Sequence, residues 1–113
     1  MSKRTPELLL GDILESSEKI LEYTKDISFE EFCKDNKTID AVIRNFEIIG
    51  EATYLLPDEI KDKSSEIDWH RIRGFRNRIV HDYFGVDLQI IWKITFDQIP
   101  ILISGIRKII QAF

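Results

Sequence analysis

The sequence is poor in cysteine, proline and glycine, and these shortages restrict what the protein can be. Its single cysteine, Cys33, allows no intramolecular disulfide and no thiol-rich metal site, which favours a cytoplasmic protein over a secreted one. Three prolines and five glycines among 113 residues leave few positions that interrupt regular structure. The apolar run near the N-terminus ends at Gly11 and is too short for a signal peptide or a membrane-spanning helix, so we expect no targeting and no membrane insertion.

Basic residues are also in deficit. With 16 Lys and Arg against 20 Asp and Glu, the formal net charge is -4, which argues against a broad basic surface that follows a nucleic-acid backbone. A hydrophobic content of 43% in 113 residues suffices for one compact core but not for two. We therefore predict a single domain over residues 1–113, in which any contact with nucleic acid is local.

What the sequence does contain is helical periodicity. Apolar residues recur at helical spacing along most of the chain, and the expected helices are residues 6–26, 28–34, 38–56, 69–84 and 88–113. The polar connection that follows Pro57 has room for one more helical turn. Four long helices and one short one, joined by short loops, predict an all-α fold, an antiparallel four- to five-helix bundle.

Capping residues and prolines mark where these helices begin and end. N-caps are expected at Thr5, Ser28, Asp68 and Asp87, and Glu31 stands at the third position of a capping box that begins with Ser28. Pro57 should stop the third helix, and Pro100 should kink or break the last one, because proline cannot donate the helical hydrogen bond.

The third helix carries a narrow charged stripe on an otherwise apolar cylinder. At about 100° per residue, Asp40, Arg44, Glu47 and Glu51 fall within roughly 60° of one another. One reading is a solvated edge in which Arg44 pairs with Asp40 and Glu47. The other is a polar cleft in which the carboxylates hold arginines of another helix. The spacing leaves both readings open.

The fourth helix contains the most distinctive stretch of the chain, "WHRIRGFRNRIVHDYFG" at residues 69–85. It gathers both histidines and four of the seven arginines of an acidic protein. On a helical wheel Arg76 lies at the edge of the apolar stripe close to Tyr83, and His81 lies on a flank where a second molecule could dock. A lone helical histidine is most often a surface residue, so spacing by itself does not make His81 catalytic.

Histidine and arginine without a metal-binding cluster suit metal-independent cleavage of RNA. Histidine can take the proton from the ribose 2′-hydroxyl or give one to the leaving oxygen, because its pKa lies close to neutral pH. Arginine can bind the phosphate and stabilise the charge that develops on it. His70 and His81 are eleven residues apart, which is not a short-range metal-ligand spacing, and the sequence has no Gly-rich phosphate loop.

The segment "RNRIVHDY", residues 76–83, resembles the R-x4-H-x-Y motif of the HepT toxins, a branch of the HEPN (higher eukaryotes and prokaryotes nucleotide-binding) superfamily. The segments "IDAVIRNFEIIGEA" and "IIWKITFDQIPIL" are similar to that family in the same order and spacing. The resemblance covers roughly residues 5–110. The R-x4-H pair alone is a weak signal, but the combination of segments is a strong one.

The resemblance implies a function and a set of residues that perform it. Arg76 and His81 would be the catalytic pair of a metal-independent endoribonuclease that needs no cofactor, with Asn77 beside them. The family fold is an all-α bundle whose homodimer brings two R-x4-H motifs together across a cleft. Tyr83 would receive AMP from a cognate minimal nucleotidyltransferase antitoxin, which would silence the toxin.

Other residues are given only a supporting role by the same resemblance. Asp40, Arg44 and Glu51 match the charged helix that borders the family's site, and Arg73 precedes the motif on the fourth helix. The alternative function is a non-catalytic helical module that binds the nucleotidyltransferase or a nucleotide.

Overall fold

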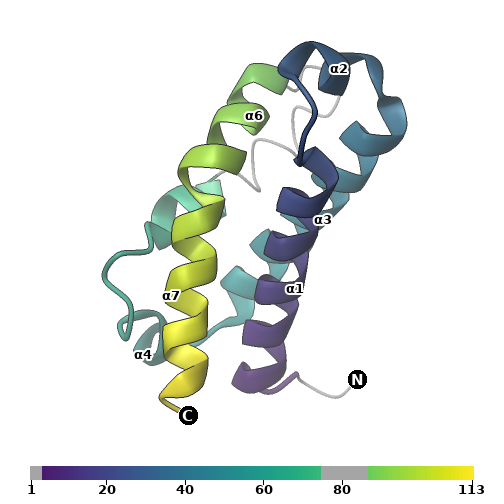
Figure 1. Ribbon diagram of the computed structural model, residues 1–113. Helices are drawn as coiled ribbons and strands as arrows, with labels where there is room; N and C mark the ends of the chain where they lie inside the picture. Colours follow the sequence, from purple (N-terminus) through teal and green to yellow (C-terminus); the bar gives the residue numbers. More distant parts are fainter. Residues whose placement is uncertain (1–3, 75–86) are drawn as a thin grey trace.

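A computed structural model describes residues 4–74 and 87–113, and within these ranges the chain forms helices and loops without any strand (Figure 1). The helices are α1 (Pro6–Thr24), α2 (Phe29–Lys34), α3 (Asn36–Leu55), α4 (Asp58–Lys61), α6 (Leu88–Asp97) and α7 (Ile99–Gln111). Residues 69–74 are helical as well. The prediction of an all-α bundle is confirmed.

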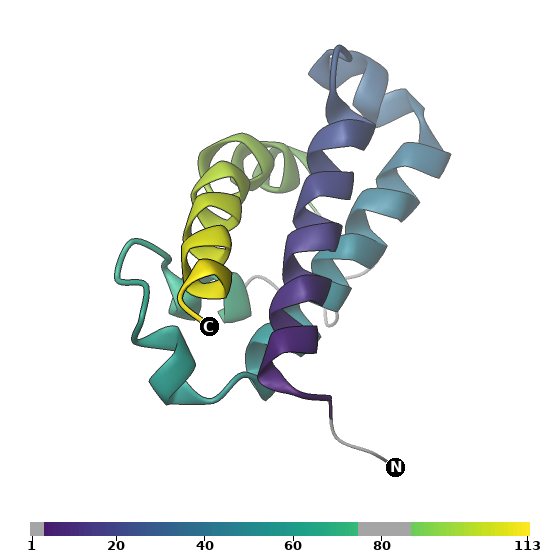
Figure 2. The ribbon, with the colours of Figure 1, turned by 60° about the horizontal axis from the view of Figure 1, so that its bottom comes forward.

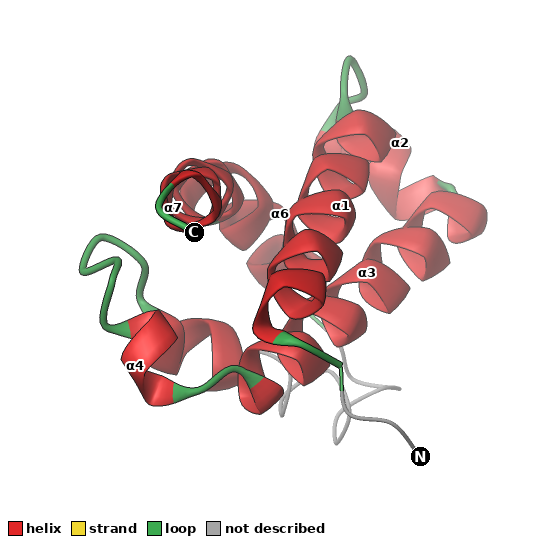
Figure 3. Cartoon of the chain, turned by 90° about the horizontal axis from the view of Figure 1, so that it is seen from below, coloured by secondary structure: helices red, strands yellow, loops and turns green. Residues whose placement is uncertain are grey.

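The long helices pack as antiparallel neighbours around α1. α1 contacts α3 on one side and α7 on the other, and it runs antiparallel to both (Figures 1 and 3). Turning the molecule keeps this order, with α1 between α3 and α7 (Figure 2). The short helix α2 contacts α3 and α6 at one end of the bundle.

The core lies mainly between α1 and the helices α3 and α7 on either side of it. Fully buried aliphatic side chains in these three helices are Leu10, Ile13 and Ile20; Val42 and Ile49; Ile99, Leu102, Ile106 and Ile109. Each such side chain contributes about 1.5–3 kcal/mol on burial, so packing of these faces stabilises the bundle more than any single polar contact does. None of the described helices is long and apolar enough to cross a membrane.

The predicted N-caps are confirmed. Thr5 Oγ1 accepts a hydrogen bond from the Leu8 backbone N–H at 3.2 Å. Ser28 and Glu31 form the reciprocal capping box, with bonds of 3.1 and 3.0 Å. Asp68 and Asp87 also accept backbone N–H bonds through their carboxylates, at 3.0 and 2.9 Å.

Several predicted boundaries differ from the structure. The last helix ends at Gln111 rather than at residue 113, and α3 ends at Leu55, one residue earlier than expected. α1 ends at Thr24 rather than near residue 26, because Lys25 is extended and Asp26 takes a left-handed conformation with φ 62° that turns the chain towards α2. α3 begins at Asn36 rather than Thr38. Asp35 ends α2 and also caps α3, accepting from the Thr38 N–H at 3.1 Å, so a single residue separates the two helices.

The break that Pro100 led us to expect in the last helix is confirmed, but it lies two residues earlier, at Gln98. α6 ends at Asp97, and Pro100 lies in the first turn of α7, where its missing N–H costs nothing. Gln98 serves both helices: its N–H donates to the Ile94 carbonyl at 2.8 Å, and its carbonyl accepts from the Leu102 N–H at 2.9 Å.

Candidate functional site

The four residues of the R-x4-H-x-Y motif named above, Arg76, Asn77, His81 and Tyr83, lie outside the described residues. The structure does describe the helical turns at residues 69–74 that lead into the motif, together with the helix α3 beside them. The surroundings of the candidate site can therefore be built from these two elements.

A local cap begins the helical segment 69–74, and two contacts fix the segment to the bundle. Asp68 caps it, accepting bonds from the N–H of Arg71 through its carboxylate at 3.0 Å and from the N–H of Ile72 through its carbonyl at 3.1 Å. The Trp69 indole N–H donates to the carbonyls of Lys61 and Ser64, at 3.0 and 3.3 Å. The side chain of Ile72 is buried in the core. The helical segment 69–74 is thus held by polar and apolar contacts together.

A cation–π contact joins this segment to α3. The guanidinium carbon of Arg73 lies 5.0 Å from the centroid of the Tyr54 ring, and both side chains are exposed. Tyr54 is in the last turn of α3, whereas Arg73 comes three residues before Arg76 in the sequence. The contact therefore places the approach to the motif beside the C-terminal end of α3.

The charged stripe of α3 faces solvent. Asp40, Arg44 and Glu51 are exposed and Glu47 is half-buried. Among the described residues no ion pair joins Arg44 to Asp40 or to Glu47, so the pairing expected for a self-contained solvated edge is absent. Arg73 of the helical segment 69–74 contacts α3 through the ring of Tyr54. In the part of the chain that the structure describes, the stripe therefore has the exposure expected of a solvated edge, and the arginine–carboxylate contacts of the polar cleft are not confirmed.

Tyr54 is the residue that the sequence-based reasoning missed. It follows Glu47 by seven residues, close to two helical turns, so it lies within about 20° of Glu47 on the same stripe. Extending the helical wheel by one turn would have included it. Asp40 and Tyr54 lie at opposite ends of the stripe, because fourteen residues correspond to about 21 Å along the helix axis. Asp40 is therefore far from Arg73, which contacts Tyr54.

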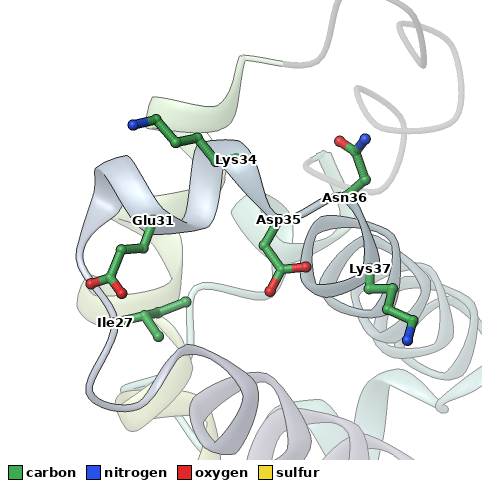
Figure 4. A pocket seen from close by; sticks show the side chains of 6 residues that line it. All are labelled: Ile27, Glu31, Lys34, Asp35, Asn36 and Lys37. Atoms are coloured by element: carbon green, nitrogen blue, oxygen red, sulfur yellow. The ribbon is translucent and has the colours of Figure 1, made fainter.

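A hollow of about 550 Å³ lies elsewhere, between α2 and the start of α3 (Figure 4). It is lined by Ile27, Glu31, Lys34, Asp35, Asn36 and Lys37. The Asp35 carboxylate is already bonded to the backbone N–H and the hydroxyl of Thr38, and these bonds hold its pKa below the ordinary range. Lys34 and Lys37 extend away from that carboxylate (Figure 4). The hollow therefore lacks groups that converge on one ligand.

Metal-ligating side chains are scattered in the part of the chain that the structure describes. Residues 4–74 and 87–113 contain no group of three or more histidine, cysteine, aspartate or glutamate side chains placed to hold a metal ion. Cys33, the lone thiol, is exposed.

Comparison of the sequence with known proteins identifies a family. The family model described as "Ribonuclease HepT-like" matches residues 13–109. A Thermococcus cleftensis protein named "Probable ribonuclease HepT" is 42% identical over 107 residues, which cover 95% of this chain and 97% of the relative. No solved structure is significantly similar to the chain.

Two further relatives carry RNase in their names. One, from Methanocaldococcus jannaschii, is 40% identical and the match covers 98% of this chain and 92% of the relative. The other, from Caldanaerobacter subterraneus subsp. tengcongensis, is 42% identical with 96% of each chain covered. The matches run almost from end to end and include α3, the helical segment 69–74 and the residues that follow it, so the chain belongs to the HepT-like ribonuclease family.

Proposed function

We propose that the protein is a metal-independent endoribonuclease whose reaction centre is built on Arg76 and His81, with Asn77 as a neighbouring polar group. The observation that carries this proposal is the family match over residues 13–109, which contains the complete R-x4-H-x-Y sequence at residues 76–83. The contacts of Asp68, Trp69 and Ile72 support it, because they anchor the helical turn that leads into the motif.

The chemistry follows from the residue types. The ribose 2′-oxygen attacks the adjacent phosphorus, the bond to the 5′-oxygen breaks, and the products are a 2′,3′-cyclic phosphate and a 5′-hydroxyl. One proton leaves the 2′-hydroxyl and one is delivered to the 5′-oxygen, and imidazole can serve in either step. Arg76 stabilises the negative charge on the phosphoryl oxygens during transfer. A homodimer would supply two copies of His81 to one cleft, one for each proton transfer.

The proposal extends to regulation. The protein would be the toxin of a toxin–antitoxin pair, and a cognate minimal nucleotidyltransferase would inactivate it by transferring AMP to Tyr83. The added nucleotide carries negative charge and bulk, and both oppose RNA binding in a cleft that depends on Arg76. Arg44 and Glu51 on α3 would border this cleft, with Arg73 beside them, and Asp40 would lie further along the same helix.

The cleavage is tested with purified protein and RNA in the presence of a chelator. We expect the wild type to generate fragments with 2′,3′-cyclic phosphate ends, and His81→Ala and Arg76→Ala to lose that activity. Matched controls are His70→Ala, which removes the other, exposed histidine, and Arg107→Ala, which removes an exposed arginine on α7. A His81→Ala variant that cleaves as fast as the wild type would refute the assignment.

Growth distinguishes the enzyme from a non-catalytic binding module. Overproduction of the wild type should arrest growth, and overproduction of His81→Ala should not. If neither protein slows growth, and neither cleaves RNA, the protein is instead a helical module that binds the nucleotidyltransferase or a nucleotide.

The modification is tested by measuring the intact mass of the protein after co-expression with a minimal nucleotidyltransferase. The wild type should gain the mass of AMP, and Tyr83→Phe should not. Tyr23→Phe is the matched control, since Tyr23 is an exposed tyrosine on α1. An adduct that persists in Tyr83→Phe would show that another side chain is modified.

A further inference from the structure

Tyr54 and Arg73 form an open stack on the surface of the protein. Tyr54 is 55% exposed although its neighbour Thr53 is fully buried, so the ring projects from a helix whose opposite face is in the core. The guanidinium of Arg73 lies over one face of the ring at 5.0 Å and is itself exposed. The pair therefore presents a flat cation and an aromatic ring to solvent.

The stack contributes little to folding, because an exposed cation–π contact is among the weaker contacts in a protein. Both groups remain accessible to a ligand.

The geometry of the stack suits a nucleobase. The guanidinium of Arg73 lies over the ring of Tyr54, and both groups are exposed. Bases stack on aromatic rings and also on guanidinium planes. Tyr54 and Arg73 thus offer two flat groups of the kinds on which an unpaired base stacks.

We propose that Tyr54 and Arg73 form a subsite that binds one unpaired nucleobase of the RNA substrate by stacking. The inference rests on the proposed function, because it assigns this subsite to the substrate of the same site. Arg73 comes three residues before Arg76 in the chain, so a base held on the stack lies on a nucleotide close to the cleaved phosphate. The subsite would select where the RNA is cut without performing the chemistry.

The first test measures binding without cleavage. The probe is a fluorescently labelled single-stranded RNA whose riboses are 2′-O-methylated, so that no attacking hydroxyl is present. Tyr54→Ala should weaken binding by about 5- to 150-fold, which corresponds to the stacking energy lost per base. Tyr54→Phe should bind as the wild type does, because the ring is retained. Tyr23→Ala is the matched control, since it removes an exposed tyrosine from α1.

The second test locates the base. A set of otherwise identical RNAs carries a single abasic nucleotide at successive positions. At one position the abasic change should weaken wild-type binding but leave Tyr54→Ala unaffected, because the variant has already lost that stack. If Tyr54→Ala lowers affinity equally for every abasic RNA, the ring does not stack on a base and the inference is wrong.

Salt dependence separates stacking from phosphate binding by Arg73. Loss of a phosphate contact reduces the slope of log affinity against log salt by about one, whereas loss of a stack leaves it unchanged. We expect Arg73→Ala to lower affinity with an unchanged slope. A reduced slope would assign Arg73 to the backbone and overturn the stacking role proposed for it.

Cleavage kinetics distinguish failure of this inference from failure of the proposed function. Tyr54→Ala should raise KM with little change in kcat, whereas His81→Ala should abolish turnover while still binding the methylated RNA. Loss of activity in His81→Ala with an unchanged KM in Tyr54→Ala would refute only the stacking subsite. If the wild type binds the methylated RNA through Tyr54 but cleaves no RNA, only the proposed nuclease activity is refuted. A Tyr54→Ala variant that changes oligomeric state by sedimentation, with unchanged RNA affinity, would instead place the ring in an interface between copies of the chain.

Discussion

At Gly105 in α7 a loop packs closely against the helix, and this approach yields a quantitative prediction. A Cβ atom at this position would lie 2.5 and 2.6 Å from Cδ1 and Cγ1 of Ile67, and 2.9 Å from Oγ of Ser64. Favourable contacts between carbon atoms are about 3.5–4.0 Å long, so Gly105→Ala forces an adjustment of roughly 1 Å. Ile67 is only 5% exposed and β-branched, which leaves its side chain little freedom to move away.

Two opposing terms set the size of the effect. Alanine is the better helix former by about 1 kcal/mol, which favours the variant. Overpacking of a well-packed core costs about 1–3 kcal/mol, and the two short contacts to one branched side chain place this case in the upper part of that range. We therefore expect Gly105→Ala to lower the free energy of unfolding by about 1–2 kcal/mol.

Urea denaturation followed by circular dichroism measures this change, and α1 provides a matched control. A Cβ atom at Gly11 would have no atom within 4 Å, and Gly11 is an exposed residue inside a helix. Gly11→Ala should therefore raise the free energy of unfolding by about 0.5–1 kcal/mol. The same chemical change is thus expected to have opposite signs at the two glycines.

A double-mutant cycle assigns the loss to the contact with Ile67. Ile67→Ala alone should destabilise by about 2–5 kcal/mol, because it empties a buried site. In that background Gly105→Ala should cost much less, since the clashing atoms are gone. Additive effects, or a Gly105→Ala variant as stable as Gly11→Ala, would refute the steric argument. Because Ile67 immediately precedes the Asp68 cap, Gly105→Ala should also slow RNA cleavage.

Three further changes test the local contacts. Hydrogen bonds from Thr38 lower the pKa of Asp35 below its ordinary value of about 3.9, so the stabilisation is present above that pH and is lost as pH falls through the lowered pKa. Thermal melts of Asp35→Asn should accordingly show a lower Tm at neutral pH and a smaller loss of Tm on acidification than the wild type. Trp69→Phe removes the donor to the Lys61 and Ser64 carbonyls and should cost about 1–3 kcal/mol in urea titrations; a loss below this range would show that water replaces the indole. Arg107→Ala breaks an exposed pair with Glu18 and should change stability by less than about 1 kcal/mol, and a larger change would contradict the screening expected there.

The helices were predictable because their signals are local. A capping box such as that of Ser28 and Glu31 acts within three residues, and the same is true of the caps at Thr5, Asp68 and Asp87. The predicted start of α3 is two residues too late because the polar segment "KDNK" is typical of a turn between helices. Asp35 could serve two helices at once, since its backbone N–H ends α2 while its carboxylate begins α3.

The surroundings of the site were only partly predictable, because they depend on the path of the loop that brings the helical segment 69–74 back against α3. The sequence indicated that the stripe on α3 carries excess negative charge, and that the fourth helix could offer arginines. It could not indicate that Arg73 meets Tyr54, nineteen residues earlier. That meeting depends on the path of the loop that contains Ser64 and Ile67, which Gly105 allows to lie against α7.

The net charge of -4 limits how this protein can hold RNA. Counterion release needs many basic side chains along the backbone. On α7, Arg107 and Lys108 instead lie in exposed pairs with Glu18 and Glu66. Contacts that do not depend on phosphate charge would then add to the affinity, and the proposed stacking of a base on Tyr54 and Arg73 would be such a contact. Four of the seven arginines stand between residues 71 and 78 of this acidic chain. If they hold the backbone at few points, as the proposed function requires, single-stranded RNA would bind in few registers, and the scarcity of other basic residues would restrict the sites of cleavage.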